Sequence, residues 1–272
     1  MPDMQAMADD VQAEHDDLLQ LLVDLTEEQW DAPSTAPGWS VRDQITHVAV
    51  FDDVARMAIE EPDRFMQLRD RERADVQRYV HEVNERGRGL DGAQMLEWSA
   101  KERAALVNAL RAVDPKSRVP WFGPDMSPAS KATARLMESW AHGQDIVDTL
   151  GLDRRPTERL YHVAYIGVRA VPNSYRTNGL EIPDAAVYVA LDSPAGDRWV
   201  WGEADAANRV EGDALDFCLV VTQRRHVDDT DLVVTGDMAR EWMRIAQAFA
   251  GPPGAGREPG QFRPDSGQIR AR

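Results

Sequence analysis

The feature that most constrains this chain is residues 127–150, a stretch with strong helix signals at both ends. Ser127 can accept a hydrogen bond from the free amides of a first helical turn, and Pro128 suits the first helical position. Gly151 suits the residue just past a helix end, where the backbone turns into the left-handed region. The sequence therefore predicts one long helix over this stretch.

A carboxylate and an imidazole stand four residues apart inside this helix. Glu138 and His142 lie on one face, where their side chains can bind a single ion, and Asp145 continues the stripe as a candidate supporting residue. They supply two of the three protein ligands of a catalytic metal site. The same residues could instead form the solvent side of the helix, because apolar residues occupy roughly the opposite face: Leu136, Trp140 and Val147.

A second histidine lies on the apolar face of another predicted helix. Ser40 is a good N-cap, Asp43 favours the positive helix end, and the helix is expected to run to about Glu61, where Pro62 stops it. His47 shares its stripe with apolar residues: Val50, Phe51, Val54 and Ala58. His47 is therefore either a hydrogen-bonded core histidine or, if the two helices are neighbours, a third metal ligand.

Two tryptophans lie in loops that lead into these helices. Trp39 ends the loop 31–39, and Trp121 belongs to the loop 114–126. Aromatic side chains beside a polar cluster suit the wall of a ligand pocket, although ordinary core packing explains them equally well. Both are candidate cofactor-binding residues.

The remaining pattern predicts an α+β protein. Within residues 1–151, helices are expected over 8–25, 41–61, 91–113 and 127–150, with a charge-rich helical segment over 63–89. Four principal helices indicate a four-helix bundle with any metal site on facing helices. Residues 152–251 mix strands (185–191, 198–201, 208–211, 231–235) with helices (157–171, 213–225, 237–249), which indicates a separate, smaller domain. Residues 252–272 form a Pro/Gly/Arg-rich tail that is expected to be poorly ordered.

Composition excludes several classes of partner. The chain has 272 residues and a net charge of −16, so it repels phosphate backbones and anionic lipid, and neither nucleic acid nor a membrane is an expected partner. The single cysteine, Cys218, lies in an apolar run and predicts a buried thiol that forms no disulfide. Because no hydrophobic signal segment and no apolar run of ~20 residues occurs, the expected location is the cytoplasm.

Two segments resemble a known family. Residues 37–47, Pro-Gly-Trp-Ser-Val-Arg-Asp-Gln-Ile-Thr-His, and residues 138–145, Glu-Ser-Trp-Ala-His-Gly-Gln-Asp, resemble the metal helices of DinB-like bundles. More narrowly, they resemble the mycothiol-dependent maleylpyruvate isomerase branch, which is mostly actinobacterial. The segments 210–224 and 234–237 resemble the sterol-carrier-like domain that accompanies such bundles.

The resemblance implies a set of site residues. It implies that His47, Glu138 and His142 hold zinc, and that mycothiol is the thiol cosubstrate. Arg224 is the best match to an arginine that the family's second domain offers to an anionic substrate, and Arg225 is the competing choice. The chain departs from its relatives at Thr222-Gln223-Arg224-Arg225, where they more often carry a Gly-Arg pair.

Such a site leaves one coordination position open for chemistry. A thiol bound there is held as thiolate, which can add to an electrophilic carbon and then either leave or stay. The sequence thus predicts a metal-dependent, thiol-using S-transferase or cis-trans isomerase that acts on a small, carboxylate-bearing electrophile, as a monomer or homodimer. Zinc is the expected metal, with nickel, iron and manganese as alternatives. A hydrolase with metal-activated water and a non-catalytic metal- or ligand-binding module are the other hypotheses.

Overall fold

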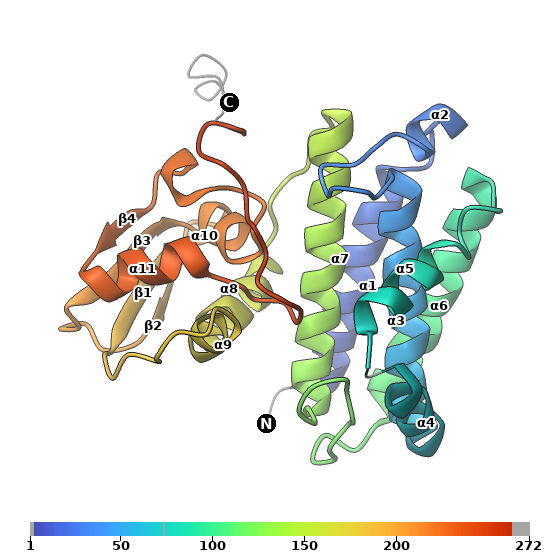
Figure 1. Ribbon diagram of the computed structural model, residues 1–272, viewed down its shortest axis with the longest axis horizontal. Coiled ribbons are helices and arrows are strands. Elements are labelled where there is room, and N and C mark those ends of the chain that lie inside the picture. The colour runs from blue at the N-terminus through green and yellow to red at the C-terminus, as the bar shows by residue number, and fades with distance from the viewer. Residues whose placement is uncertain (1–2, 73, 263–272) are drawn as a thin grey trace. The chain divides into compact units, whose positions relative to one another are not determined.

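The computed structural model describes residues 3–72 and 74–262, and the chain divides into two compact units, Met1–Arg154 and Arg155–Arg272 (Figure 1). Each unit is described by itself. In the described part of the chain, every helix is too short or too polar to cross a bilayer.

The first unit is helical. In its described residues four long helices pack on one another: α1 (Met4–Gln20), α3 (Val41–Glu60), α6 (Gly92–Ala112) and α7 (Pro128–Leu150). Helix α3 contacts both α6 and α7, and α1 contacts the same two helices on their other side (Figure 1). The shorter helices are α2 (Glu27–Trp30), α4 (Pro62–Glu72) and α5 (Val76–Asn84).

The predicted limits of α7 are confirmed. The Ser127 side chain accepts a hydrogen bond from the Ser130 amide, and Pro128 stands at the first helical position. Gly151 follows the helix with a φ of 63°, a conformation that favours glycine. Ser40 likewise caps α3 and forms the reciprocal pair of hydrogen bonds with Asp43.

Elsewhere the helices differ from expectation. The predicted segment 63–89 contains two helices, and Pro62, which was expected to stop α3, is the first residue of α4, while α3 already ends at Glu60. A proline at this position leaves no helical hydrogen bond unmade, because a first-turn amide has no helical acceptor. Helix α1 ends at Gln20 rather than near Leu25, since the Leu21 amide turns back to the Leu18 carbonyl.

The second unit confirms the α+β class. Its described residues contain a sheet in the order β2-β1-β3-β4, formed by β1 (Val187–Asp192), β2 (Arg198–Trp201), β3 (Asn208–Asp213) and β4 (Val233–Thr235). Strands β1 and β3 are parallel, whereas the two edge strands pair antiparallel to their neighbours. The helices are α8 (Leu160–Arg169), α9 (Val171–Thr177), α10 (Ala214–Val221) and α11 (Asp237–Ile245), with a 3-10 turn, η1, at Val227–Asp229.

A short helix, α9, follows the predicted segment 157–171, with Pro172 in its first turn. Two helix ends in this unit were predicted wrongly. Helix α10 stops at Val221, not at 225, because Gln223 adopts a left-handed φ of 63°. Helix α11 stops at Ile245, not at 249. Of the predicted tail, residues 252–262 contain neither helix nor strand, and residues 263–272 lie outside the described residues.

Cys218 behaves as its apolar surroundings predict. The residue is fully buried, and burial raises the pKa of its thiol well above the ordinary value. A thiol that stays protonated and covered is a core side chain rather than a nucleophile.

A buried ion cluster joins three helices of the first unit. Asp52 of α3 is 0% exposed, with its Oδ1 2.9 Å from Arg135 Nε of α7 and its Oδ2 2.8 Å from Arg103 Nε of α6. The guanidinium of Arg103 also donates to the Ser139 hydroxyl, and that of Arg135 to the Val48 carbonyl. Buried charges are tolerated only when paired in this way, so the cluster fixes how the three helices are aligned.

We expect Asp52→Ala to destabilise the protein by about 3–5 kcal/mol, because the substitution leaves two buried guanidinium groups without their carboxylate. Urea unfolding followed by circular dichroism measures the loss. The control is the adjacent Asp53→Ala, which removes a carboxylate paired with Arg56 at 34% side-chain exposure and should cost less than about 1 kcal/mol. Equal losses in the two variants would contradict the role assigned to the buried cluster.

Candidate metal centre

Helices α3 and α7 bring the three predicted ligands together. Glu138 Oε2 lies 3.2 Å from His142 Nε2 and 3.8 Å from His47 Nε2. One ligand atom from each of the three residues lies within 4.8 Å of the other two. Within residues 3–72 and 74–262, this is the one group of three or more His, Cys, Asp or Glu side chains that meets this condition. The structure therefore shows a candidate metal cluster at the positions that the sequence pattern indicated.

The cluster is partly open to solvent. The side chains of His47, Glu138 and His142 are 12%, 23% and 13% exposed. The two histidines are mostly covered and Glu138 is somewhat more exposed, so the cluster lies between the core and the solvent. Partial exposure means that a small molecule can reach the ligand atoms.

Asp145 does not join the cluster. It is 1% exposed, and its carboxylate accepts a hydrogen bond of 3.0 Å from the Thr35 hydroxyl. The Thr35 amide in turn donates to Thr149, one turn further along α7. Asp145 thus anchors the loop 31–39, which contains Trp39, to α7, the helix of Glu138 and His142.

The electrostatics of the site favour the protonation states that a metal needs. Burial lowers the pKa of His47 to about 4, although the Glu138 carboxylate opposes the shift. Burial by itself raises the pKa of Glu138, but the neighbouring His142 and His47 side chains outweigh it and hold that pKa well below its usual range. At neutral pH the site therefore offers a neutral imidazole and an anionic carboxylate, which are the metal-binding forms.

Gln44 fixes the orientation of His142. Its side-chain amide donates to the Ser34 hydroxyl at 2.8 Å, which directs its carbonyl oxygen at His142 Nδ1. In a neutral His142 the ring proton is then on Nδ1, and the lone pair on Nε2 faces Glu138. Metal-binding histidines are commonly oriented by such a partner. Gln44 was not singled out from the sequence, although it lies three residues before His47 on the same helix.

The donor set fits a divalent cation. With the proton of His142 on Nδ1, its Nε2 lone pair and the Glu138 oxygen face each other at 3.2 Å without a hydrogen between them. His47 Nδ1 is also buried without a hydrogen-bond partner among the described residues. Ligand atoms around one tetrahedral zinc are about 3.3 Å apart, given bonds of about 2.0–2.1 Å, so the distances of 3.2 and 3.8 Å from Glu138 Oε2 to the two histidines need little adjustment. A cation placed here would remove the repulsion between the facing lone pairs.

Aromatic rings surround the two histidines. The Trp39 ring is nearly parallel to His142, at 11° with centroids 5.7 Å apart, and its centroid lies 5.2 Å from that of His47. Phe51, one turn after His47, lies 4.4 Å from it, centroid to centroid. Trp39 therefore lies against the candidate ligands, which agrees with the interpretation as a pocket wall rather than with ordinary core packing.

Trp121 lies outside this ring of contacts. It stacks on Phe65 at 5.6 Å, its nearest ring at the site is Phe51 at 6.5 Å, and Lys131 Nζ lies 3.2 Å from its ring centroid. Trp121 thus packs in the hydrophobic cluster behind Phe51 and not against the candidate ligands.

The two arginines belong to the other unit. Arg224 and Arg225 follow α10, where the Arg224 guanidinium donates to the Thr222 carbonyl at 2.6 Å. The Arg225 guanidinium lies over the Phe262 ring, 4.7 Å from its centroid. Because each unit is described by itself, a role for either arginine at the metal cluster stays a prediction.

Comparisons with known proteins identify the family. Residues 11–147 match the family described as mycothiol maleylpyruvate isomerase N-terminal domain, and the chain belongs to this family. An uncharacterised protein of Mycobacterium tuberculosis, from strains CDC 1551 and H37Rv, is 42% identical over 257 residues, which cover 94% of this chain and 100% of the relative.

Two solved structures share the fold. The crystal structure of the mycothiol-dependent maleylpyruvate isomerase matches with a TM-score of 0.54 and 15% identity, over 83% of this chain and 90% of that one. A mutant of the isomerase gives the same TM-score and coverage at 14% identity. At this level of identity the likeness establishes the fold alone.

We expect Gln44→Leu to weaken metal binding by about 10- to 100-fold, because His142 loses the acceptor that orients its ring. Competition with a chromophoric chelator measures the affinity of the purified protein for zinc. Gln144→Leu is the control, since Gln144 lies on α7 two residues after His142 but hydrogen-bonds Asp148. Unchanged zinc affinity in Gln44→Leu would contradict the orienting role.

Lys131 makes the stability depend on pH. Its side chain is 1% exposed, its Nζ has no hydrogen-bond partner among the described residues, and burial lowers its pKa from 10.5 to about 6. At a pH between these two pKa values, the Lys131 amine is protonated in the unfolded chain and neutral in the folded protein. Stability should therefore rise with pH by up to about 1.4 kcal/mol per unit, and be lost as pH falls towards 6.

We expect Lys131→Met to flatten this dependence, because methionine fills the same space without a titrating group. Denaturant unfolding between about pH 6.5 and pH 9 measures the slope of the unfolding free energy in each protein. The control is Lys116→Met, at an exposed lysine of the same unit. Parallel slopes in the native protein and Lys131→Met would show that the amine is charged in the folded state.

Proposed function

We propose that the protein is a metal-dependent enzyme that uses a low-molecular-weight thiol such as mycothiol, as an S-transferase or an isomerase. The substrate is a small electrophile that bears a carboxylate. The observation that carries the proposal is the partly exposed cluster of His47, Glu138 and His142, whose ligand atoms lie within 4.8 Å of one another. Membership of a family named for a mycothiol maleylpyruvate isomerase domain supports the choice of thiol and reaction class.

The three side chains would hold the metal through two nitrogens and one oxygen. Zinc is the proposed ion because this donor set is typical of catalytic zinc sites, with nickel, iron and manganese as alternatives. When bound, such an ion lowers the pKa of a thiol beside it and so supplies a thiolate at neutral pH. The chain prepares the site by keeping His47 neutral and Glu138 anionic before any ion arrives.

The aromatic wall suits an electrophilic carbon substrate. Trp39 covers one face of His142, and Phe51 packs beside His47, so bulk water has limited access to the ring nitrogens. An activated alkene can lie against such a surface, while a sulfur nucleophile adds to one of its carbons. Departure of the sulfur after rotation about the former double bond restores the alkene and gives isomerisation. Retention of the sulfur, with a proton taken up by the neighbouring carbon, gives conjugation.

The second unit is proposed to contribute the carboxylate-binding arginine, Arg224 or Arg225. In the same proposal, residues 1–151 are a DinB-like bundle, residues 152–251 are a sterol-carrier-like domain, and the protein is a monomer or homodimer. A cytoplasmic location suits an enzyme that needs a reduced thiol. The net charge of −16 argues against nucleic acid as a partner.

Metal analysis tests the site. We expect about one divalent ion per chain in the purified protein, and a loss of most of it in His142→Ala, because one of the three ligands is removed. His81→Ala, at an exposed histidine of α5, is the control and should keep its metal. Equal metal content in the native protein and His142→Ala would remove the proposed site.

Thiol dependence tests the chemistry. With cobalt in place of the native metal, addition of mycothiol should produce a sulfur-to-cobalt charge-transfer absorption, and turnover of maleylpyruvate or a related electrophile should require the thiol. Arg224→Gln and Arg225→Gln should then identify the arginine whose loss raises KM for the carboxylate substrate. Turnover without thiol would indicate a hydrolase instead, and thiol or ligand binding without turnover would indicate a binding module.

A further inference from the structure

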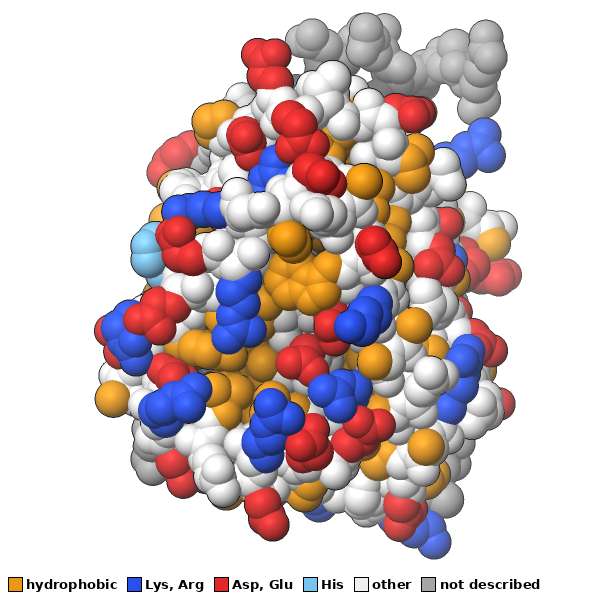
Figure 2. All heavy atoms as spheres, turned by 90° about the vertical axis from the view of Figure 1, so that its right-hand side faces the viewer, with side chains coloured by type: hydrophobic (Ala, Val, Ile, Leu, Met, Phe, Trp, Pro, Cys, Tyr) orange, Lys and Arg blue, Asp and Glu red, His pale blue; other side chains and the backbone are white. Residues whose placement is uncertain are grey.

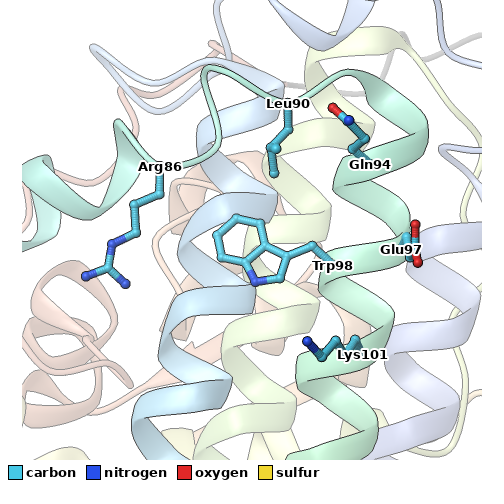
Figure 3. A pocket seen from close by; sticks show the side chains of 6 residues that line it. All are labelled: Arg86, Leu90, Gln94, Glu97, Trp98 and Lys101. Atoms are coloured by element: carbon cyan, nitrogen blue, oxygen red, sulfur yellow. The ribbon is translucent and has the colours of Figure 1, made fainter.

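A hollow on the first unit lies apart from the candidate metal ligands. Its volume is about 410 Å³, and it is lined by the loop after α5 and by one side of α6: Arg86, Leu90, Gln94, Glu97, Trp98 and Lys101 (Figure 3). Figure 2 shows hydrophobic side chains at the base of a hollow on this side of the molecule, with both basic (Lys, Arg) and acidic (Asp, Glu) side chains around them. A volume of this size suits a small ligand.

Trp98 is a rigid platform in this hollow. Trp98 packs against two hydrophobic clusters of the first unit, one that includes Phe65 and one that includes Met95, and the residue stays partly exposed. In Figure 3 the indole extends from α6 into the space between Leu90 and Lys101. A large aromatic side chain that the core holds on one side offers its remaining surface for stacking with another ring.

The loop that forms the opposite wall is held in place by α3. Gly87 packs so closely on Thr46 that an added Cβ would lie 1.8 Å from the threonine hydroxyl oxygen. The Leu90 carbonyl accepts a hydrogen bond from the Arg42 guanidinium, which is buried. Both contacts fix the backbone beside Arg86 and Leu90, so the hollow is formed before any ligand arrives.

The charges in the hollow are unbalanced. Within the described residues, neither the Arg86 nor the Lys101 side chain takes part in an ion pair or hydrogen bond. By contrast, the nearby Arg88 pairs with Asp43 at 3.3 Å. Glu97 is the one carboxylate in the lining, and in Figure 3 it lies on the other side of Trp98 from Arg86. Lys101 also interacts with Glu102, whose side chain hydrogen-bonds Trp98 next to the lining. Arg86, on the opposite wall, therefore provides the main attraction for a ligand with a single negative charge.

We propose that this hollow binds a small aromatic monoanion of the aryl carboxylate class, with its ring on Trp98 and its carboxylate attracted by Arg86 and Lys101. Gln94 adds a donor, because its side-chain oxygen is engaged by the Asp91 amide and its NH2 group has no such role. A protein partner would need a surface of about 800 Å² on each side, which is far more than this lining offers. The hollow shares no residue with the metal cluster, so the proposal is independent of the proposed function.

Titration calorimetry on the full chain tests the proposal with two probes of the same shape. We expect 2-naphthoate to bind at one site, and the neutral 2-naphthol to bind at least about tenfold more weakly, because it lacks the charge. Salt should weaken the binding of 2-naphthoate, as expected for exposed cations. The titration is repeated with His142→Ala, in which binding of 2-naphthoate should persist. Equal affinity for the two probes, loss of binding in His142→Ala, or no binding of 2-naphthoate at millimolar concentration would each overturn the proposal.

Charge variants locate the site. Arg86→Gln and Lys101→Gln should each weaken 2-naphthoate about three- to tenfold, as expected for the loss of one charged partner. Both residues are exposed, so neither change should affect folding. The matched controls, Arg64→Gln and Lys116→Gln, alter exposed cations elsewhere on the same unit and should leave the affinity unchanged. Affinity that is unaffected by both Arg86→Gln and Lys101→Gln would place the binding elsewhere and overturn the assignment.

Discussion

The alignment of α3 with α7 depends on the buried carboxylate of Asp52. Apolar side chains pack in many registers, whereas an ion pair between buried groups tolerates only small displacements. Asp52 follows His47 by five residues on α3, and its partner Arg135 precedes Glu138 by three residues on α7. A slip of one helical turn, about 5.4 Å, would separate the ligand atoms as well as the ion pair. The same interaction therefore stabilises the bundle and sets the geometry of the candidate site.

The protonation states that suit metal binding also destabilise the folded chain when no metal is bound. Keeping His47 neutral and Glu138 anionic in a largely buried place leaves lone pairs facing one another, a conflict that a cation would resolve. Binding of a metal ion would then also stabilise the folded chain, since the unfolded chain has no such cluster. Lys131, four residues before Arg135 on α7, is a second buried polar group: its Nζ lies over the Trp121 ring and has no hydrogen-bond partner among the described residues, and burial lowers its pKa.

The loop 31–39 links the environment of the site to the helix that supplies two ligands. Its hydrogen bonds to Asp145 and Thr149 anchor it along the last turns of α7, and Ser34 supports Gln44. Trp39 is thereby held against His142. Residues that contact no metal thus determine which ring nitrogen is presented and how much water reaches it. The three candidate ligands all belong to the first unit, and any contribution of the second unit to substrate binding is part of the proposed function.

The sequence by itself determined the helix ends that are set by neighbouring residues, such as Ser127 and Gly151, and the four-residue spacing that puts Glu138 and His142 on one face. It also indicated that His47 points away from solvent, because helical periodicity is a local property. Only the tertiary structure decided the rest: whether the two helices are neighbours and in which register, that Gln44 orients a ligand, and that Trp121 packs behind Phe51. These depend on contacts between residues far apart in the chain, such as the ion pair between Asp52 and Arg135, which no local pattern encodes.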